Sequence, residues 1–106
     1  MFKVGDKVWN IKDKCIDTIK QVMYESYVLE SDIRFTVKEQ DLHQTADAMF
    51  EALGYQIGIQ ENENKYYNGN STLTFSDKHL WTNTNIISID LHLAIHQKMI
   101  ELGLIE

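Results

Sequence analysis

The sequence predicts an α+β protein: a small curled β-barrel, then a helix, an antiparallel β-meander and a C-terminal helix. The N-terminal part holds short apolar segments joined by tight turns, which is typical of a small barrel. Two later segments place apolar residues at three- and four-residue spacing, as amphipathic helices do. Between them, residues alternate with period two on either side of an Asn-Gly pair, which indicates a hairpin.

The first part of the chain predicts four strands, at residues 7–11, 15–23, 27–30 and 33–37. In the last of these, Ile33, Phe35 and Val37 fall on one face, as the period of a pleated strand requires. Residues 24–26 have the composition of a turn. We expect these strands to curl into the barrel.

A helix is expected next, because one apolar stripe recurs at helical spacing in Leu42, Ala46, Met49, Phe50 and Leu53. Asp41 or Thr45 can cap its start by accepting backbone N–H bonds. Gly54 can adopt the left-handed conformation that ends it.

The meander is expected at residues 55–59, 66–67, 71–75 and 80–82, with a polar loop at 61–65 and a hairpin at Asn68-Gly69. The last helix is predicted to begin after Ser88, a good N-cap, and to end at Gly103. Its apolar residues cover a wide arc that includes His92 and His96. We therefore expect two modules, at residues 1–42 and 43–106.

Composition restricts the class of protein. Apolar residues make up 43% of the chain, with two Trp, five Tyr and four Phe, which argues against disorder. We expect core positions for Trp9, Phe35, Phe50, Phe75 and Trp81. Cys15 is the only cysteine, which favours a reducing compartment, and no apolar run has the length of a membrane span. The sequence thus predicts a cytoplasmic protein without membrane contact.

Charge is distributed unevenly. Residues 1–20 carry five lysines against three aspartates, a net charge of +2, whereas residues 21–63 carry nine acidic residues against two basic ones, a net charge of −7. Direct binding of DNA or RNA requires basic residues that neutralise phosphates, so the acidic stretch argues against it. An acidic surface suits a partner with a basic surface. The alternative is that these charges only keep the protein soluble.

The candidate partner-binding residues combine this acidity with exposed aromatic rings, which are favoured at interfaces. Tyr66 and Tyr67 are adjacent in a predicted strand, so they point to opposite faces and one of them should be exposed. The full candidate set is Glu25, Glu30, Asp32, Glu61, Glu63, Tyr66 and Tyr67.

No pattern predicts catalysis, and no cofactor is expected. His92 and His96 lie at i, i+4 on one helix face, as in helical zinc sites, but only two ligands are local. The alternative is that they pack against neighbours, each with one ring nitrogen hydrogen-bonded. Cys15 lies among apolar residues of a predicted strand, where a buried thiol would be inert. A pairing of Cys15 with His79 or His92 stays open from the sequence.

Two sets of residues carry a resemblance to known proteins. Residues 2–9 (FKVGDKVW), 33–37 (IRFTV) and 39–42 (EQDL) resemble the SH3-like barrels of small phage proteins. Residues 49–55 (MFEALGY), 66–67 (YY), 94–98 (AIHQK) and 101–103 (ELG) are similar to a helix–meander–helix module in accessory proteins of phages and prophages of Gram-positive bacteria. Most of these are core and cap positions, which report fold.

The resemblance implies a setting for the function and no catalytic residues. Small phage accessory proteins often disarm host defences, and anti-CRISPR proteins are an example, many of them acidic competitors for a basic groove. We therefore expect a non-catalytic inhibitor in the host cytoplasm that covers a basic nucleic-acid-binding surface, with a Cas nuclease as the most specific candidate. The alternatives are a structural or regulatory phage protein with an apolar interface, and a metal-binding protein that uses His92 and His96.

Overall fold

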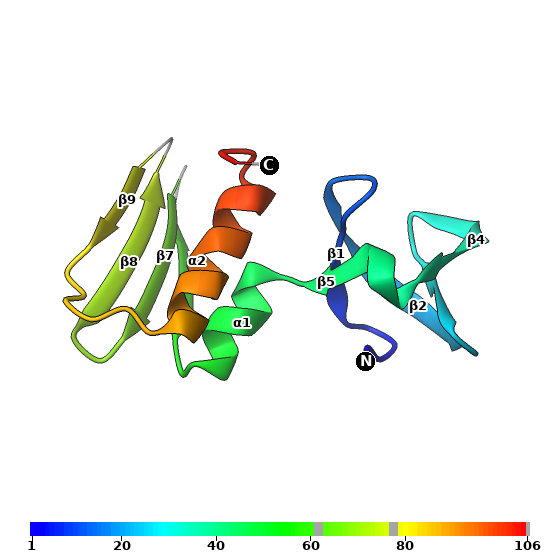
Figure 1. Cartoon of the computed structure of the whole chain (residues 1–106), viewed down its shortest axis with the longest axis horizontal. Helices are drawn as coiled ribbons and strands as arrows, with labels where there is room; N and C mark the ends of the chain where they lie inside the picture. The colour runs from blue at the N-terminus through cyan, green and yellow to red at the C-terminus, as the bar shows by residue number, and fades with distance from the viewer. Residues whose placement is uncertain (61–62, 77–78, 106) are drawn as a thin grey trace. The chain divides into compact units, whose positions relative to one another are not determined.

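A computed structural model describes residues 1–60, 63–76 and 79–105 of the chain and confirms the α+β class (Figure 1). The chain divides into two compact modules, Met1–Thr45 and Ala46–Glu106. The boundary lies three residues after the expected one, because Leu42–Gln44 forms a strand of the first module.

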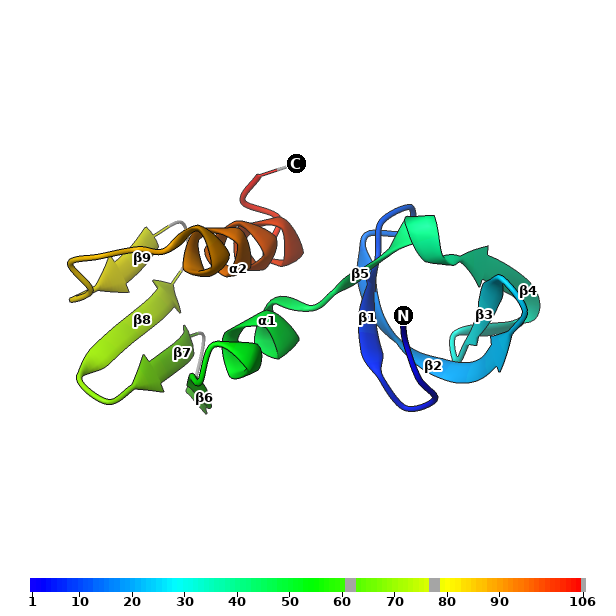
Figure 2. The ribbon, with the colours of Figure 1, turned by 60° about the horizontal axis from the view of Figure 1, so that its bottom comes forward.

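The N-terminal module is a five-stranded antiparallel sheet in the order β4-β3-β2-β1-β5. Its elements are β1 (Lys7–Asn10), β2 (Cys15–Met23), β3 (Ser26–Leu29), β4 (Asp32–Lys38), the 3-10 turn η1 (Glu39–Asp41) and β5 (Leu42–Gln44). The strands curl strongly (Figure 2). Within this module, all of which is described, no ladder joins β4 to β5, so the sheet is barrel-like but open.

The core of the N-terminal module is small. It consists of Val8, Ile19, Tyr27, Leu29 and Leu42, with Phe2 and Val37 packed against it. The prediction that Leu42 begins the stripe of the following helix is therefore wrong. Leu42 pairs with Asn10 across the β1–β5 ladder and packs inside the first module.

The C-terminal module places two helices on one face of a four-stranded antiparallel sheet in the order β6-β7-β8-β9 (Figures 1 and 2). Its elements are α1 (Ala46–Ala52), β6 (Gln56–Gln60), β7 (Glu63–Asn68), β8 (Ser71–Ser76), β9 (His79–Thr82) and α2 (Ile89–Glu101). Strand β7 begins inside the segment expected to be a polar loop, since Asn64 and Lys65 pair with Ile59 and Gly58. Neither described helix has the length and apolar character needed to cross a membrane.

Aromatic rings fill the core of this module. Phe50 of α1 stacks on Tyr66 with ring centroids 4.1 Å apart, and it meets Tyr55 and Phe75 edge-on at 5.8 and 6.2 Å. The expected helix ends are confirmed: the Ser88 side chain accepts a hydrogen bond from the Leu91 amide at 3.1 Å, and Gly54 has a φ of 90°.

Two of the expected core aromatics are exposed instead. Phe35 on β4 and Trp81 on β9 are 64% and 65% exposed, whereas Trp9, Phe50 and Phe75 are buried as predicted. Both exposed rings lie on strands at the edge of their sheet. The alternation of apolar and polar residues assigns such a ring to one face of its strand, but it does not show that another element covers this face. A strand at the edge of a sheet has a neighbouring strand on one side only.

Candidate functional site

A pocket of about 700 Å³ opens beside the hairpin that joins β2 and β3. Its apolar lining comes from both strands and from the N-terminal segment. The residues around it are Met1, Val22, Met23, Tyr24, Glu25, Ser26, Tyr27, Lys38, Glu39 and Gln40. We call this set the hairpin pocket.

The hairpin itself presents an aromatic ring to solvent. Met23 pairs with Ser26, so Tyr24 and Glu25 form a two-residue turn. Glu25 has a φ of 65°, a left-handed conformation that residues with a Cβ seldom adopt. Tyr24 is 91% exposed, and Val22 and Met23 beside it are also exposed.

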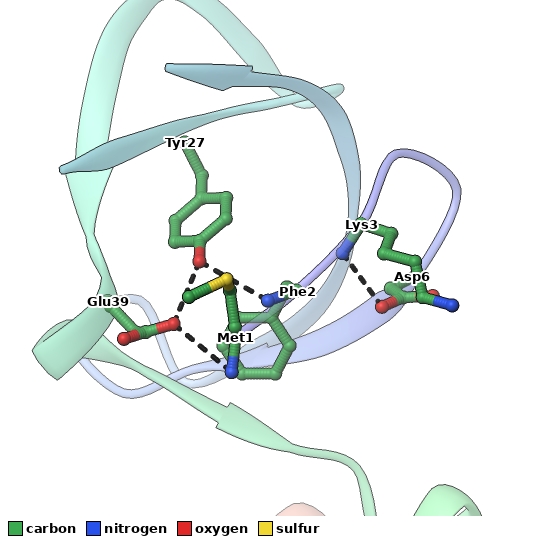
Figure 3. Close-up of polar contacts among 6 residues, drawn as sticks. All are labelled: Met1, Phe2, Lys3, Asp6, Tyr27 and Glu39. Carbon is green, nitrogen blue, oxygen red and sulfur yellow. Dashed lines mark hydrogen bonds and ion pairs between the residues drawn. The ribbon is translucent and has the colours of Figure 1, made fainter. Parts of the chain in front are cut away.

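A polar network holds the N-terminal segment against the inner side of the pocket (Figure 3). The Tyr27 hydroxyl donates to Glu39 Oε1 at 2.8 Å and accepts from the Phe2 amide at 3.2 Å. The Met1 ammonium lies 3.3 Å from the same Glu39 oxygen. The Phe2 ring packs edge-on to Tyr27 with centroids 5.7 Å apart, so the network is anchored to the core.

These contacts fix the protonation of the two titratable groups. The Tyr27 hydroxyl bond, together with the Met1 ammonium, lowers the pKa of Glu39 below its ordinary value. The Phe2 amide acts to lower the pKa of Tyr27, but the bond to Glu39, burial and the Glu39 charge together raise it. Glu39 is thus an anion and Tyr27 a neutral donor near neutral pH. General acid–base catalysis needs a group that titrates near the working pH, so this pair suits binding better than proton transfer.

The predicted acidic residues do not form one patch. Glu25 lies in the β2–β3 turn, while Glu30 and Asp32 lie at the other end of β3, roughly 13 Å away at ~3.3 Å per residue. The Asp32 carboxylate accepts from the Arg34 amide at 3.2 Å and pairs with the Arg34 guanidinium at 3.3 Å. The boundary between the modules also divides the acidic stretch, five of its acidic residues preceding it and four following it.

The two candidate tyrosines separate as expected, one to each face of β7. Tyr66 is fully buried, and its hydroxyl donates to Asp47, so it is unavailable to a partner and is withdrawn from the candidate set. Tyr67 is 36% exposed on the face opposite the helices. Glu61 lies outside the described residues, as does the side chain of Glu63.

The structure contradicts the expectation that His92 and His96 lie within the apolar arc of the last helix. His92 and His96 are exposed and lie outside the buried arc of α2, which is formed by Leu91, Ala94 and Ile95. Their ring centroids are 6.4 Å apart. Among the residues that the structure describes, no three His, Cys, Asp or Glu side chains are grouped closely enough to hold a metal ion.

Cys15 is exposed, contrary to the expectation that it is buried. It is the first residue of β2 and follows Lys14, whose φ is 53°, so it lies at the end of a hairpin and not within a covered strand. Partial desolvation of this mostly exposed sulfur, followed by the charges of Asp17 and Asp13, raises the pKa of the thiol. A raised pKa keeps the thiol protonated near neutral pH, and the protonated form is a poor nucleophile.

Five residues at the pocket are not predicted as site residues from the sequence: Met1, Val22, Met23, Tyr24 and Glu39. A tyrosine beside an acidic residue in a short turn is a usable signal for Tyr24, because turn residues are exposed. No local signal links residues 1, 24 and 39, which only the curl of the sheet brings to one pocket.

Comparison of the chain with family models, curated proteins and solved structures finds no match.

Proposed function

We propose that this chain is a non-catalytic binding protein whose hairpin pocket contacts a host protein with a basic surface. The observation that carries the proposal is Tyr24, which stands almost fully exposed on a constrained turn beside exposed Val22 and Met23. Exposed apolar residues next to one another mark interaction sites, and tyrosine is enriched among the residues that dominate binding energy.

The pocket carries two carboxylates that a cationic group of a partner could contact, beside two cationic groups of its own. Glu25 and Glu39 line it, and Glu39 is held as an anion. Lys38 lines it as well, and the ammonium that meets Glu39 belongs to Met1. An arginine or lysine of a partner could form the same contact with Glu39 while its aliphatic part packs on the methionines.

The setting we propose is that of a phage accessory protein that inhibits a host defence, with a Cas nuclease as the most specific candidate target. It rests on the resemblance of residues 2–9 and 49–55 to such proteins and on the acidity of the chain. An acidic, aromatic surface could occupy the groove in which a nuclease holds nucleic acid.

The test compares capture of host proteins by the wild type, Tyr24→Ala and Glu25→Lys, with quantification by mass spectrometry. We expect a specific partner to be lost in both variants and to be released by salt, since exposed charge contacts are screened. A purified partner should then bind with a dissociation constant raised at least about tenfold by Tyr24→Ala, the scale of an interface hot spot.

Two matched variants serve as controls. Glu30→Lys makes the same charge change in an exposed turn at the other end of β3, and Trp81→Ala removes an exposed aromatic ring from the other module. Both should bind as the wild type does. Equal capture by all the variants would show that the hairpin pocket is not the binding site, and capture that is insensitive to salt would favour the apolar alternative.

A further inference from the structure

Helix α2 carries large apolar residues on its outer side as well as on its buried side. The buried side contributes Leu91, Ala94 and Ile95 to the core of the C-terminal module and also holds the polar residues Gln97 and Lys98. On the outer side, Ile89 and Leu93 are 79% and 48% exposed. A helix that only covers a sheet carries polar residues there, whereas a helix with apolar residues all round is typically covered on both sides.

The apolar residues of the outer side follow a heptad spacing. Ile89, Leu93, His96 and Ile100 are separated by four, three and four residues, so they form one stripe along the helix. We call these four residues the α2 stripe. Alternate steps of three and four residues are the spacing with which one helix packs along another. The spacing therefore indicates that a further helix covers the stripe.

We propose that this helix is α2 of a second copy of the chain, packed antiparallel about a two-fold axis between Leu93 and His96. In this register Ile89 faces Ile100 of the second copy, and Leu93 faces His96. The α2 stripe supplies both sides of the contact, and every pair occurs twice because the interface is isologous. Each copy thus covers the apolar residues that the other exposes.

The polar residues of α2 favour the antiparallel arrangement over a parallel one. Asp90 lies in the first turn and is exposed. A parallel pair would place the two Asp90 carboxylates at the same end and the two His96 rings in the same layer. Antiparallel packing separates the two Asp90 residues by roughly 14 Å along the axis, at ~1.5 Å per residue. It also sets the positive end of each helix dipole beside the negative end of the other.

Self-association of the full chain, measured by sedimentation equilibrium up to about 1 mM, tests the interface, because a contact of one short helix pair is small and weak. Ile89→Asn should weaken association about tenfold or more, since it replaces two apolar contacts with amides. His96→Leu should strengthen association about tenfold or more, because a polar residue at such a position costs stability.

Two matched variants serve as controls for these shifts. Ile33→Asn changes an exposed isoleucine in the other module, and His79→Leu changes an exposed histidine on β9. Both should associate as the wild type does, and circular dichroism verifies that every variant is folded. The α2 stripe carries no formal charge, so its association should persist in salt that releases a partner from the hairpin pocket. Either proposal can therefore fail without the other.

Two mixtures test the direction of the helices. Ile89→Glu mixed with Ile100→Lys sets opposite charges face to face in the antiparallel register and restores one pair of isoleucines. Ile89→Glu mixed with Ile89→Lys does so only in a parallel pair. In low salt we expect the first mixture to associate about tenfold or more tightly than the second.

Four results would each overturn the proposal. They are a wild type that stays monomeric throughout the concentration range, seam-independent association in which Ile89→Asn or His96→Leu behaves as its control does, a second mixture at least as tight as the first, and a monomeric chain that holds a different protein through Ile89. The last result would assign the α2 stripe to that protein. Opposite shifts in the two variants, with the first mixture the tighter, support both the interface and its direction.

Discussion

The two modules differ in how they use their apolar residues. The C-terminal module packs Phe50, Tyr66 and Phe75 between two helices and a sheet. The N-terminal module has a smaller core and leaves large apolar residues exposed on the hairpin and on the edge strand, with Tyr24 and Phe35 as the clearest cases. Ring stacking and helix cover therefore stabilise one module, while the other presents more of its apolar strand residues to solvent.

This difference indicates a division of roles. A curled sheet without helices has no second layer to cover its outer residues, so the same residues that build it are available for contacts. The proposed hairpin pocket lies in this module. The C-terminal module has its own exposed residues, such as Trp81 and Ile89, but they flank a well-filled core.

The largest expected effect tests the core of the C-terminal module. Phe50→Ala removes a fully buried ring that contacts three others, and we expect the free energy of unfolding to fall by about 3–5 kcal/mol. Amide hydrogen exchange should show the loss of protection in β8, at Leu73, and not in β3, at Val28. Ile19→Ala is the counterpart in the N-terminal module, and its loss should appear at Val28. A uniform loss in either variant would mean that the two modules unfold as one unit.

The next effect concerns the contact that joins the two helices. Glu101 of α2 accepts the amide of Ala46, the first residue of α1, at 2.6 Å and the Gln97 side chain at 3.1 Å. Glu101→Ala leaves both donors without this partner and should lower the free energy of unfolding by about 1–3 kcal/mol. Glu101→Gln retains an acceptor and should cost less. Urea titration measures both, and equal losses would show that the hydrogen bonds contribute little.

The pH dependence of Glu101 has a defined sign. Burial is the main cause that raises its pKa above the ordinary value of 4.5. The folded protein then binds this proton more tightly than the unfolded chain does, so this group favours folding less as pH rises from 4.5 through the raised pKa. In urea titrations between pH 4 and 7, Glu101→Gln should remove the part of the decline in the free energy of unfolding that comes from this carboxyl group. A pH profile identical to that of the wild type would contradict the raised pKa of Glu101.

Glu39 in the N-terminal module should behave in the opposite way. Its pKa is lowered, so its stabilising contribution is present above 4.5 and is lost as pH falls through the folded value. Thermal melts of Glu39→Gln should therefore lose less stability than the wild type on acidification below pH 4.5. Glu30→Gln, in an exposed turn, is the control and should follow the wild type.

The smallest effect on stability is expected at Phe35, which the sequence places in the core. Phe35→Thr should change the free energy of unfolding by less than about 1 kcal/mol, because an exposed ring under one guanidinium contributes little. Chemical denaturation measures this change. A loss as large as that of Phe50→Ala would mean that Phe35 is covered in solution.

The fold was predictable where a signal is local. Ser88 and Gly54 act through the backbone next to them, so their structural roles follow from residue type. The predicted hairpin is present but one residue later than expected, because Asn68 pairs with Ser71 and the turn residues are Gly69 and Asn70. Leu42 was assigned to the wrong module because it satisfies the helical spacing of the residues after it, while its real partner, Asn10, is distant in the chain. Phe35 lies in the predicted strand, but the pattern of one strand reports neither the register shift between β3 and β4 nor whether another element covers the ring.

The site was predictable only in part. Glu25 was selected for its charge, and the structure places it at the pocket. Tyr66 was selected with Tyr67 because adjacent strand residues point to opposite faces, and only the position of the helices decides which of the two is buried. Glu39 joins the pocket through Tyr27 and Met1, contacts between distant segments that no spacing in the sequence reports.

The contact between Glu101 and Ala46 also has a practical consequence for dissecting the protein. A fragment cut before Ala46 would carry its new α-ammonium at the position from which the backbone amide now donates to Glu101. The hydrogen bond that closes the helix pair would become an ion pair with the same carboxylate. Cleavage at this boundary therefore creates a compensating charge, which makes residues 46–106 a suitable starting point for producing the second half of the chain alone.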